Sequence, residues 1–137
     1  MLGRLALIAV LVAGMPIAAA QKLAIHVTVA AHVTRDDVLV RALRDALDKA
    51  LAARPRALPA GYSVDASIVR LEVAPVGASE LEVRAEVRAI LSDERGRMHV
   101  TTSARTVARG SARDRALLQK DAIVESAKQL AKRLASG

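Results

Sequence analysis

The sequence contains no cysteine, and this absence removes several kinds of protein at once. No disulfide can stabilise the chain, and no cysteine is available to carry the lipid of a lipoprotein leader. Thiolate metal ligands and cysteine nucleophiles are excluded as well. The folded state must therefore depend on packing alone.

Aromatic residues are almost absent: Phe and Trp do not occur, and Tyr62 is the only aromatic residue. The core must then be built from Val, Ala, Leu and Ile, which make many small contacts without a large anchor. Pockets for small molecules are usually lined by aromatic side chains. The composition thus argues against a ligand pocket.

The residue patterns of catalysis and metal binding are also missing. The only histidines are His26, His32 and His99, and none has the spacing of a zinc site, so we interpret His26 as a solvated strand residue. There is no G-x-S-x-G elbow, no S-x-x-K motif and no glycine-rich phosphate loop. We predict a noncatalytic protein with no cofactor and no metal. The alternative is a small hydrolase or lipid-binding protein whose site is invisible in the sequence.

The N-terminus has the pattern of a secretory signal peptide. Arg4 gives a positive charge, residues 5–12 are an unbroken apolar run, and residues 18–20 are small. We predict a signal peptide over residues 1–20 and a single α+β domain over 21–137, in a protein that is periplasmic or secreted.

The alternative is that the leader stays attached as a membrane anchor. Residues 5–20 are short for a bilayer and are interrupted by Gly14 and Pro16, which favours cleavage. After cleavage we expect no integral membrane span.

Hydrophobic periodicity predicts six elements. Strict alternation is typical of strands, and apolar residues three or four apart are typical of helices. A change of phase at Ile68 and Val69 predicts a bulge in the second strand. The strands are predicted at residues 22–30, 62–73, 80–91 and 98–108. One helix is predicted to begin after Thr34 and to stop at Pro55 and Pro59, and the second to cover residues 112–134.

Both helices are preceded by a capping-box spacing. Thr34 stands three residues before Asp37, and Ser111 stands three residues before Asp114. Acidic residues in the first turn suit the positive end of the helix dipole. We therefore expect Thr34 and Ser111 to mark the helix starts, and Pro55 to end the first helix.

This order favours one architecture. Three consecutive strands with short turns pair as an antiparallel meander, and a helical connection favours a parallel first strand. We predict an α+β two-layer sandwich of order β-α-β-β-β-α. Its two helices would pack on one face of a four-stranded, mostly antiparallel sheet.

The strand at 80–91 places charges of both signs on the face turned from the core. Glu80, Glu82 and Glu86 share one phase with Arg84 and Arg88. Carboxylates so close could serve acid/base chemistry, but the alternating arginines neutralise the row. We interpret it as a cross-strand charge ladder.

Basic charge is concentrated late in the chain. The net charge is +7, and it becomes +6 without residues 1–20, which hold Arg4 and no acid. A basic surface favours anionic partners such as lipid headgroups, polysaccharide or acidic proteins, although it can also be merely a solvated face. Residues 95–115 contain one acid, Asp114, and six arginines: Arg95, Arg97, Arg105, Arg109, Arg113 and Arg115.

Two families resemble this arrangement in outline. Residues 35–134 resemble the double-stranded RNA-binding fold, in which a helix with a basic start follows three antiparallel strands; here that start is Ala112-Arg113-Asp114-Arg115. This resemblance implies nucleic-acid binding as an alternative. The mature chain also resembles soluble domains of bacterial outer-membrane assembly and secretion proteins, which share topology and not signature residues.

These observations lead to one functional prediction. We expect an exported, bacterial-type envelope protein that binds or assembles with another macromolecule through the basic patch and a sheet face or edge. The partner would be another envelope protein or an anionic envelope polymer. Nucleic acid is not the expected partner, because an exported protein meets little of it. The sequence leaves the oligomeric state open.

Overall fold

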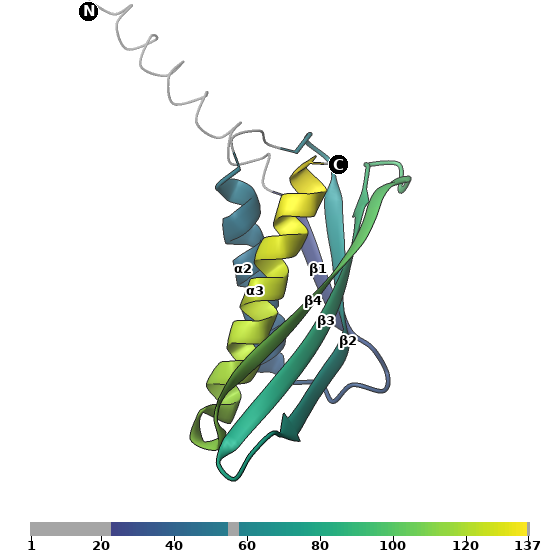
Figure 1. The fold of residues 1–137 in the computed structure, drawn as a ribbon. Coiled ribbons are helices and arrows are strands. Elements are labelled where there is room, and N and C mark those ends of the chain that lie inside the picture. Colours follow the sequence, from purple (N-terminus) through teal and green to yellow (C-terminus); the bar gives the residue numbers. More distant parts are fainter. Residues whose placement is uncertain (1–22, 55–57, 137) are drawn as a thin grey trace, which may run out of the picture.

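A computed structural model describes residues 23–54 and 58–136. The predicted leader and Pro55 lie outside these residues. The predicted order and fold class are confirmed. With the labels of Figure 1, the elements are β1 (Ala24–Val29), α2 (Asp37–Ala52), β2 (Ser63–Pro75), β3 (Glu80–Ser92), β4 (Met98–Ser111), the 3₁₀ turn η1 (Ala112–Asp114) and α3 (Arg115–Ser136).

The four strands form one mixed sheet in the order β1-β2-β3-β4. β1 is parallel to β2, and the other neighbours are antiparallel. The parallel pair follows from the α2 connection, which lets the chain return to the same end of the sheet. Both helices lie on one face (Figure 1), and the other face carries no helix of the described chain. In this part of the chain neither helix combines the length and apolar character of a membrane span.

The predicted bulge in β2 is confirmed. The register of β2 against β3 shifts between Ile68 and Arg70. As a result Val64 and Ile68 before the bulge, and Leu71 and Val73 after it, all contribute to the helix-covered side. The bulge thus explains how residues of both phases in the sequence can face the helices.

The starts of the helices differ in part from the prediction. Asp36, and not Thr34, is the N-cap of α2, because the Asp36 carboxylate accepts a hydrogen bond from the Val38 N–H at 2.9 Å. Ser111 is a cap as predicted: its hydroxyl accepts from the Arg113 N–H at 3.3 Å. A 3₁₀ turn then precedes α3.

The core lies between the sheet and the two helices and is made of aliphatic side chains. Leu43 and Leu47 of α2 and Ile123, Leu130 and Leu134 of α3 are almost completely buried. From the sheet, Val64, Val83 and Val87 face them.

One polar contact lies within this core. Thr106 of β4 donates a hydrogen bond to the Ala122 carbonyl of α3 at 2.8 Å, and buried Ser126 donates to the same oxygen at 2.9 Å. The hydroxyl groups of Thr106 and Ser126 also contact each other. This contact joins β4 to α3.

The strand register defines two ends of the sheet. The hairpin end holds a row formed by Ala24, Ser63, Ser92 and Met98. The β3–β4 hairpin at residues 93–97 lies beyond it. The far end holds the β2–β3 turn and the start of α3 (Figure 1).

Candidate functional site

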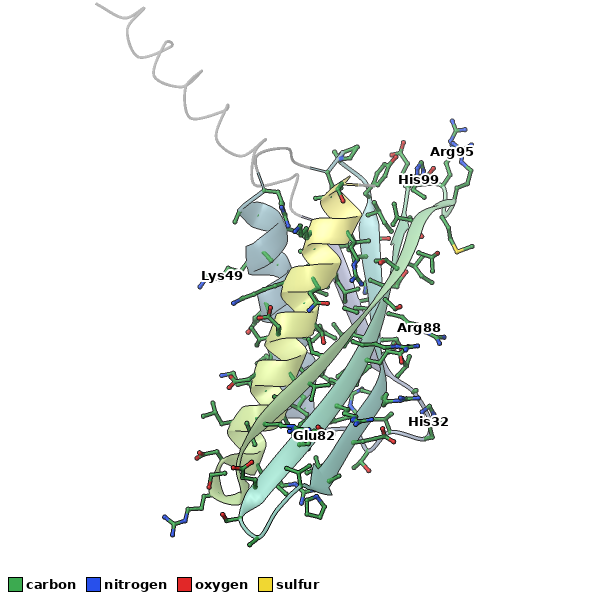
Figure 2. The ribbon with its side chains drawn as sticks, viewed as in Figure 1. His32, Lys49, Glu82, Arg88, Arg95 and His99 are labelled. Atoms are coloured by element: carbon green, nitrogen blue, oxygen red, sulfur yellow. The ribbon has the colours of Figure 1, made fainter. Side chains whose placement is uncertain are left out.

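The open face of the sheet carries an ordered set of charges. Side chains alternate between the two faces of a strand, so the second phase of β3 points away from the helices. The β3–β4 register sets Glu82 opposite Arg109 and Glu86 opposite Arg105. We call the six residues Glu82, Arg84, Glu86, Arg88, Arg105 and Arg109 the arginine face; Figure 2 labels Glu82 and Arg88.

Glu82 is held by two arginines. Arg84 Nε donates to Glu82 Oε2 at 2.7 Å, and Arg109 Nε donates to Oε1 at 2.9 Å. A terminal nitrogen of Arg109 also lies 2.8 Å from Oε1. The carboxylate therefore accepts charge-assisted hydrogen bonds on both oxygens. These bonds, first from Arg109 and then from Arg84, lower the pKa of Glu82 below its usual range.

Glu86 has the same surroundings four residues further along β3. Arg105 Nε lies 3.3 Å from Glu86 Oε1, and Arg88 Nε lies 3.8 Å from Oε2. Glu82 and Glu86 are each only 6% exposed, although no helix covers them. The arginine side chains themselves shield these carboxylates from water.

The geometry leaves the guanidinium groups available to a partner. The four arginine side chains are 60–79% exposed. A guanidinium has five N–H donors in a rigid plane, so one held through Nε keeps donors for a second carboxylate or phosphate. Four cations against two anions also give the arginine face an excess of positive charge. It can therefore bind an anionic group without losing its internal ion pairs.

The open face of β2 next to it is more balanced. Arg70 Nε lies 3.9 Å from Glu72 Oε1, and both side chains are more than half exposed. A groove of about 500 Å³ runs from Glu72 and Ala74 to Glu82 and Arg84. The positive excess therefore lies toward β4, one of the two edge strands of this sheet.

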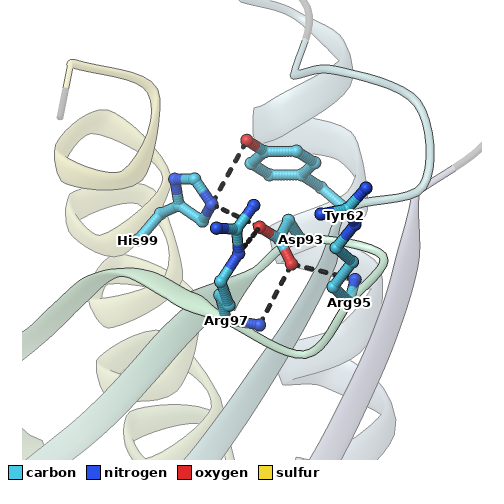
Figure 3. A network of polar contacts seen from close by, with 5 residues as sticks. All are labelled: Tyr62, Asp93, Arg95, Arg97 and His99. Carbon is cyan, nitrogen blue, oxygen red and sulfur yellow. Dashed lines mark hydrogen bonds and ion pairs between the residues drawn. The ribbon is translucent and has the colours of Figure 1, made fainter.

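A second polar cluster holds the β3–β4 hairpin (Figure 3). Asp93 Oδ1 accepts from the N–H groups of Arg95 at 2.9 Å and Arg97 at 3.0 Å. Asp93 Oδ2 accepts from Arg97 Nε at 3.2 Å and lies 2.9 Å from His99 Nε2. Tyr62 packs on His99 with ring centroids 5.0 Å apart, which ties the hairpin to the start of β2.

These contacts stabilise the charged form of Asp93. Its pKa is lowered to about 2, first by the hydrogen bond to His99 and then by the N–H groups of Arg97 and Arg95. All its partners lie within the hairpin and its base, so the cluster serves to fix the hairpin. The strand pattern predicted a short turn between residues 91 and 98 but not the cluster. The available signal was an Asp followed three residues later by Gly96, whose φ is +82°.

The six predicted patch arginines fall in three places. Arg95 and Arg97 lie in the hairpin, and Arg105 and Arg109 lie on the arginine face. Arg113 and Arg115 follow β4 at the far end. Because β4 has 14 residues and a strand rises about 3.3 Å per residue, roughly 45 Å separates the outer pairs. The structure brings together only Arg105 and Arg109, and it adds Arg84 and Arg88 from β3.

The histidines lie apart from the arginine face. His26 is exposed on β1 opposite Asp65. His32 Nε2 lies 2.9 Å from the Val69 carbonyl at the β2 bulge. Within residues 23–54 and 58–136, no three His, Cys, Asp or Glu side chains are grouped as metal ligands.

Comparison with known proteins gives a likeness of fold. No family model matches the chain, and no curated protein matches it. A protein from Caulobacter crescentus described as a putative lipoprotein is 23% identical, with a TM-score of 0.50 over 79% of this chain and 83% of its own. A minor lipoprotein from Acinetobacter baumannii is 13% identical, with a TM-score of 0.56 over 85% and 94%.

A third solved structure with this fold is an assembly. PelC from Paraburkholderia phytofirmans, crystallised as a dodecamer, is 15% identical to this chain, with a TM-score of 0.51 over 79% of this chain and 86% of PelC. At these identities the likeness establishes the fold of this chain. It assigns no function to any residue.

Proposed function

We propose that this protein is an exported, noncatalytic domain of the bacterial cell envelope that binds an anionic envelope macromolecule through the arginine face. One observation carries the proposal: four exposed guanidinium groups are held in place by two shielded carboxylates on a sheet face without helices. Such fixed donors bind an anion with little loss of side-chain freedom.

The leader pattern and the fold support the envelope part of the proposal. Residues 1–20 have the composition of a secretory signal peptide. The same fold occurs in proteins described as lipoproteins of two bacteria. The likeness to a protein that forms a dodecamer makes assembly with other copies or other proteins a reasonable extension.

The chemistry of the arginine face defines the partner. Arginine forks bind carboxylates and phosphates in pairs of parallel hydrogen bonds. The partner is therefore an envelope protein with an acidic surface, or a polymer bearing carboxylate or phosphate groups. A partner that lies along β3 and β4 would meet two such sites, about 14 Å apart for four residues of strand.

The test is partner recovery from a bacterial envelope fraction with the purified protein as bait. The variant Arg105→Gln with Arg109→Gln removes two cations from the arginine face, whereas Arg105→Lys with Arg109→Lys keeps the charge and loses the fork. The proposal predicts that the Gln variant loses the partner and that the Lys variant recovers much less than the wild type.

A matched control lies on the other layer of the molecule. Arg41 and Arg44 are exposed on α2, so Arg41→Gln with Arg44→Gln removes the same charge far from the arginine face. This control is expected to recover the partner as well as the wild type does. Equal recovery of the partner by the wild type and all three variants would show that the arginine face does not bind it.

A further inference from the structure

The β3–β4 hairpin places two arginines next to an exposed apolar side chain. Met98 is 69% exposed, the highest value among the large hydrophobic residues described. It follows Arg95 and Arg97 in sequence, and Figure 2 labels Arg95 at the tip. Arg97 is paired with Asp93, whereas no ion pair of the Arg95 side chain occurs among the described residues.

Other basic residues reach the same end of the molecule. α3 ends at the same end of the molecule as the hairpin (Figure 1). Its last residues include Lys132 and Arg133, both exposed. Arg133 donates to the Ser103 carbonyl of β4, which fixes the end of the helix against the sheet. The hairpin also holds two acids, the shielded Asp93 and the exposed Glu94, so the four basic residues Arg95, Arg97, Lys132 and Arg133 exceed them by two charges.

The N-terminal segment also joins the domain at this end. Ala24, the first residue of β1, lies in the same sheet row as Met98. Three interstrand spacings separate the two, which amounts to about 14 Å. β1 therefore begins at the hairpin end of the sheet.

We propose that the hairpin end docks onto an anionic phospholipid surface, with Arg95 and Arg97 on the lipid phosphates and Met98 at the boundary between headgroups and acyl chains. The inference rests on the proposed envelope location and adds a partner for a surface separate from the arginine face. Basic residues bind anionic leaflets by electrostatic attraction, and an adjacent apolar side chain adds burial. The Asp93 cluster supports docking because it fixes the hairpin before contact.

The test is sedimentation of the purified secreted protein with phospholipid vesicles. One set of vesicles holds equal amounts of phosphatidylglycerol and phosphatidylcholine, and the other holds phosphatidylcholine alone. We expect binding to the anionic vesicles at low ionic strength, weak binding to the neutral ones, and a loss of binding as salt rises. Equal binding to both sets would overturn the proposal.

Single substitutions locate the contact. Arg95→Glu changes the charge by two units at the hairpin end, and Arg113→Glu makes the same change at the far end. Because each basic residue near an anionic surface is worth roughly five-fold in affinity, Arg95→Glu is expected to weaken binding at least five-fold, and Arg113→Glu less than two-fold. Met98→Ser is expected to weaken binding about three-fold.

The contrasting result is equally specific. Equal losses from Arg95→Glu and Arg113→Glu would show attraction by net charge and contradict docking by the hairpin. Unchanged thermal midpoints for these exposed substitutions confirm that the variants are folded. If the protein does not bind anionic vesicles but still recovers its partner through Arg105 and Arg109, the docking proposal fails and the proposed function stands. If it binds the vesicles through the hairpin but the Arg105 and Arg109 variants recover the partner normally, only the role of the arginine face is contradicted.

Discussion

The two faces of β3 exclude water by different means. On the helix side Val83 and Val87 are fully buried in the core between the sheet and the helices. On the open side Glu82 and Glu86 are nearly as well shielded, but by arginines from β3 itself and from β4. The first kind of burial depends on apolar packing, and the second depends on charge.

This difference separates stability from binding. Apolar packing responds little to salt or pH, whereas exposed ion pairs weaken as salt rises and as carboxylates become protonated. A partner can therefore engage the arginines without disturbing the core. The two faces should respond differently to substitution, pH and salt.

The largest effect is expected in the core. Leu130 of α3 is completely buried, and Leu130→Ala should lower the free energy of unfolding by about 2–5 kcal/mol because the cavity is filled only in part. Val107→Ala on the open face removes an exposed side chain and should change it by less than about 0.5 kcal/mol. Urea denaturation measures both values, and similar costs would contradict the contrast between the faces.

A smaller effect is expected for the polar contact within the core. Thr106→Val keeps the shape of the side chain and removes its hydrogen bond to the Ala122 carbonyl. The expected loss is about 1–2 kcal/mol, since the hydrogen bond to Ala122 and the contact with the Ser126 hydroxyl are both removed. Ser126→Ala offers the matched measurement on α3. If both variants are more stable than the wild type, this polar contact destabilises the folded protein.

The Asp93 cluster should make stability depend on acid pH. Its pKa is lowered from 3.8 to about 2 in the folded protein, so the stabilisation is present above about pH 4 and is lost as the pH falls toward 2. Asp93→Asn should lower the thermal midpoint at pH 7, because an amide N–H₂ would face the donors of Arg97 and His99. The difference from the wild type should shrink between pH 4 and pH 2; a constant difference would contradict this origin.

The smallest effect is expected on the arginine face. The folded-state pKa of Glu82 is lowered, so its ion pairs stabilise the protein above about pH 4.5 and this contribution fades at lower pH. Glu82→Gln should therefore be slightly less stable than the wild type at neutral pH and low salt. In 1 M NaCl the thermal midpoints of Glu82→Gln and the wild type should become equal. If Glu82→Gln is less stable than the wild type by the same amount at low and high salt, packing and not charge holds the arginine face together.

Local patterns were enough to predict most of the fold. The alternation along 80–91 predicted which face of β3 packs on the helices, and the phase change at Ile68 predicted the bulge, because both depend on side-chain direction alone. The cap of α2 was predicted two residues too early because Thr34 and Asp36 both have side chains that can cap.

The candidate site required information that the sequence pattern does not hold. Counting charges along 95–115 grouped residues that an extended strand spreads over both ends of the sheet. Arg105 and Arg109 meet Glu86 and Glu82 only in one register of β4 against β3, which the hairpin fixes. The charged phase of β3 was predicted to face away from the core, but the sequence did not indicate that neighbouring arginines would shield its carboxylates from water.

The most direct test of the account is N-terminal sequencing of the protein recovered from fractionated cells. A domain that works in the envelope should be found outside the cytoplasm, with Gln21 as its first residue once residues 1–20 have been removed. Recovery from the cytosol with Met1 still in place would contradict the claim that this is an exported envelope protein.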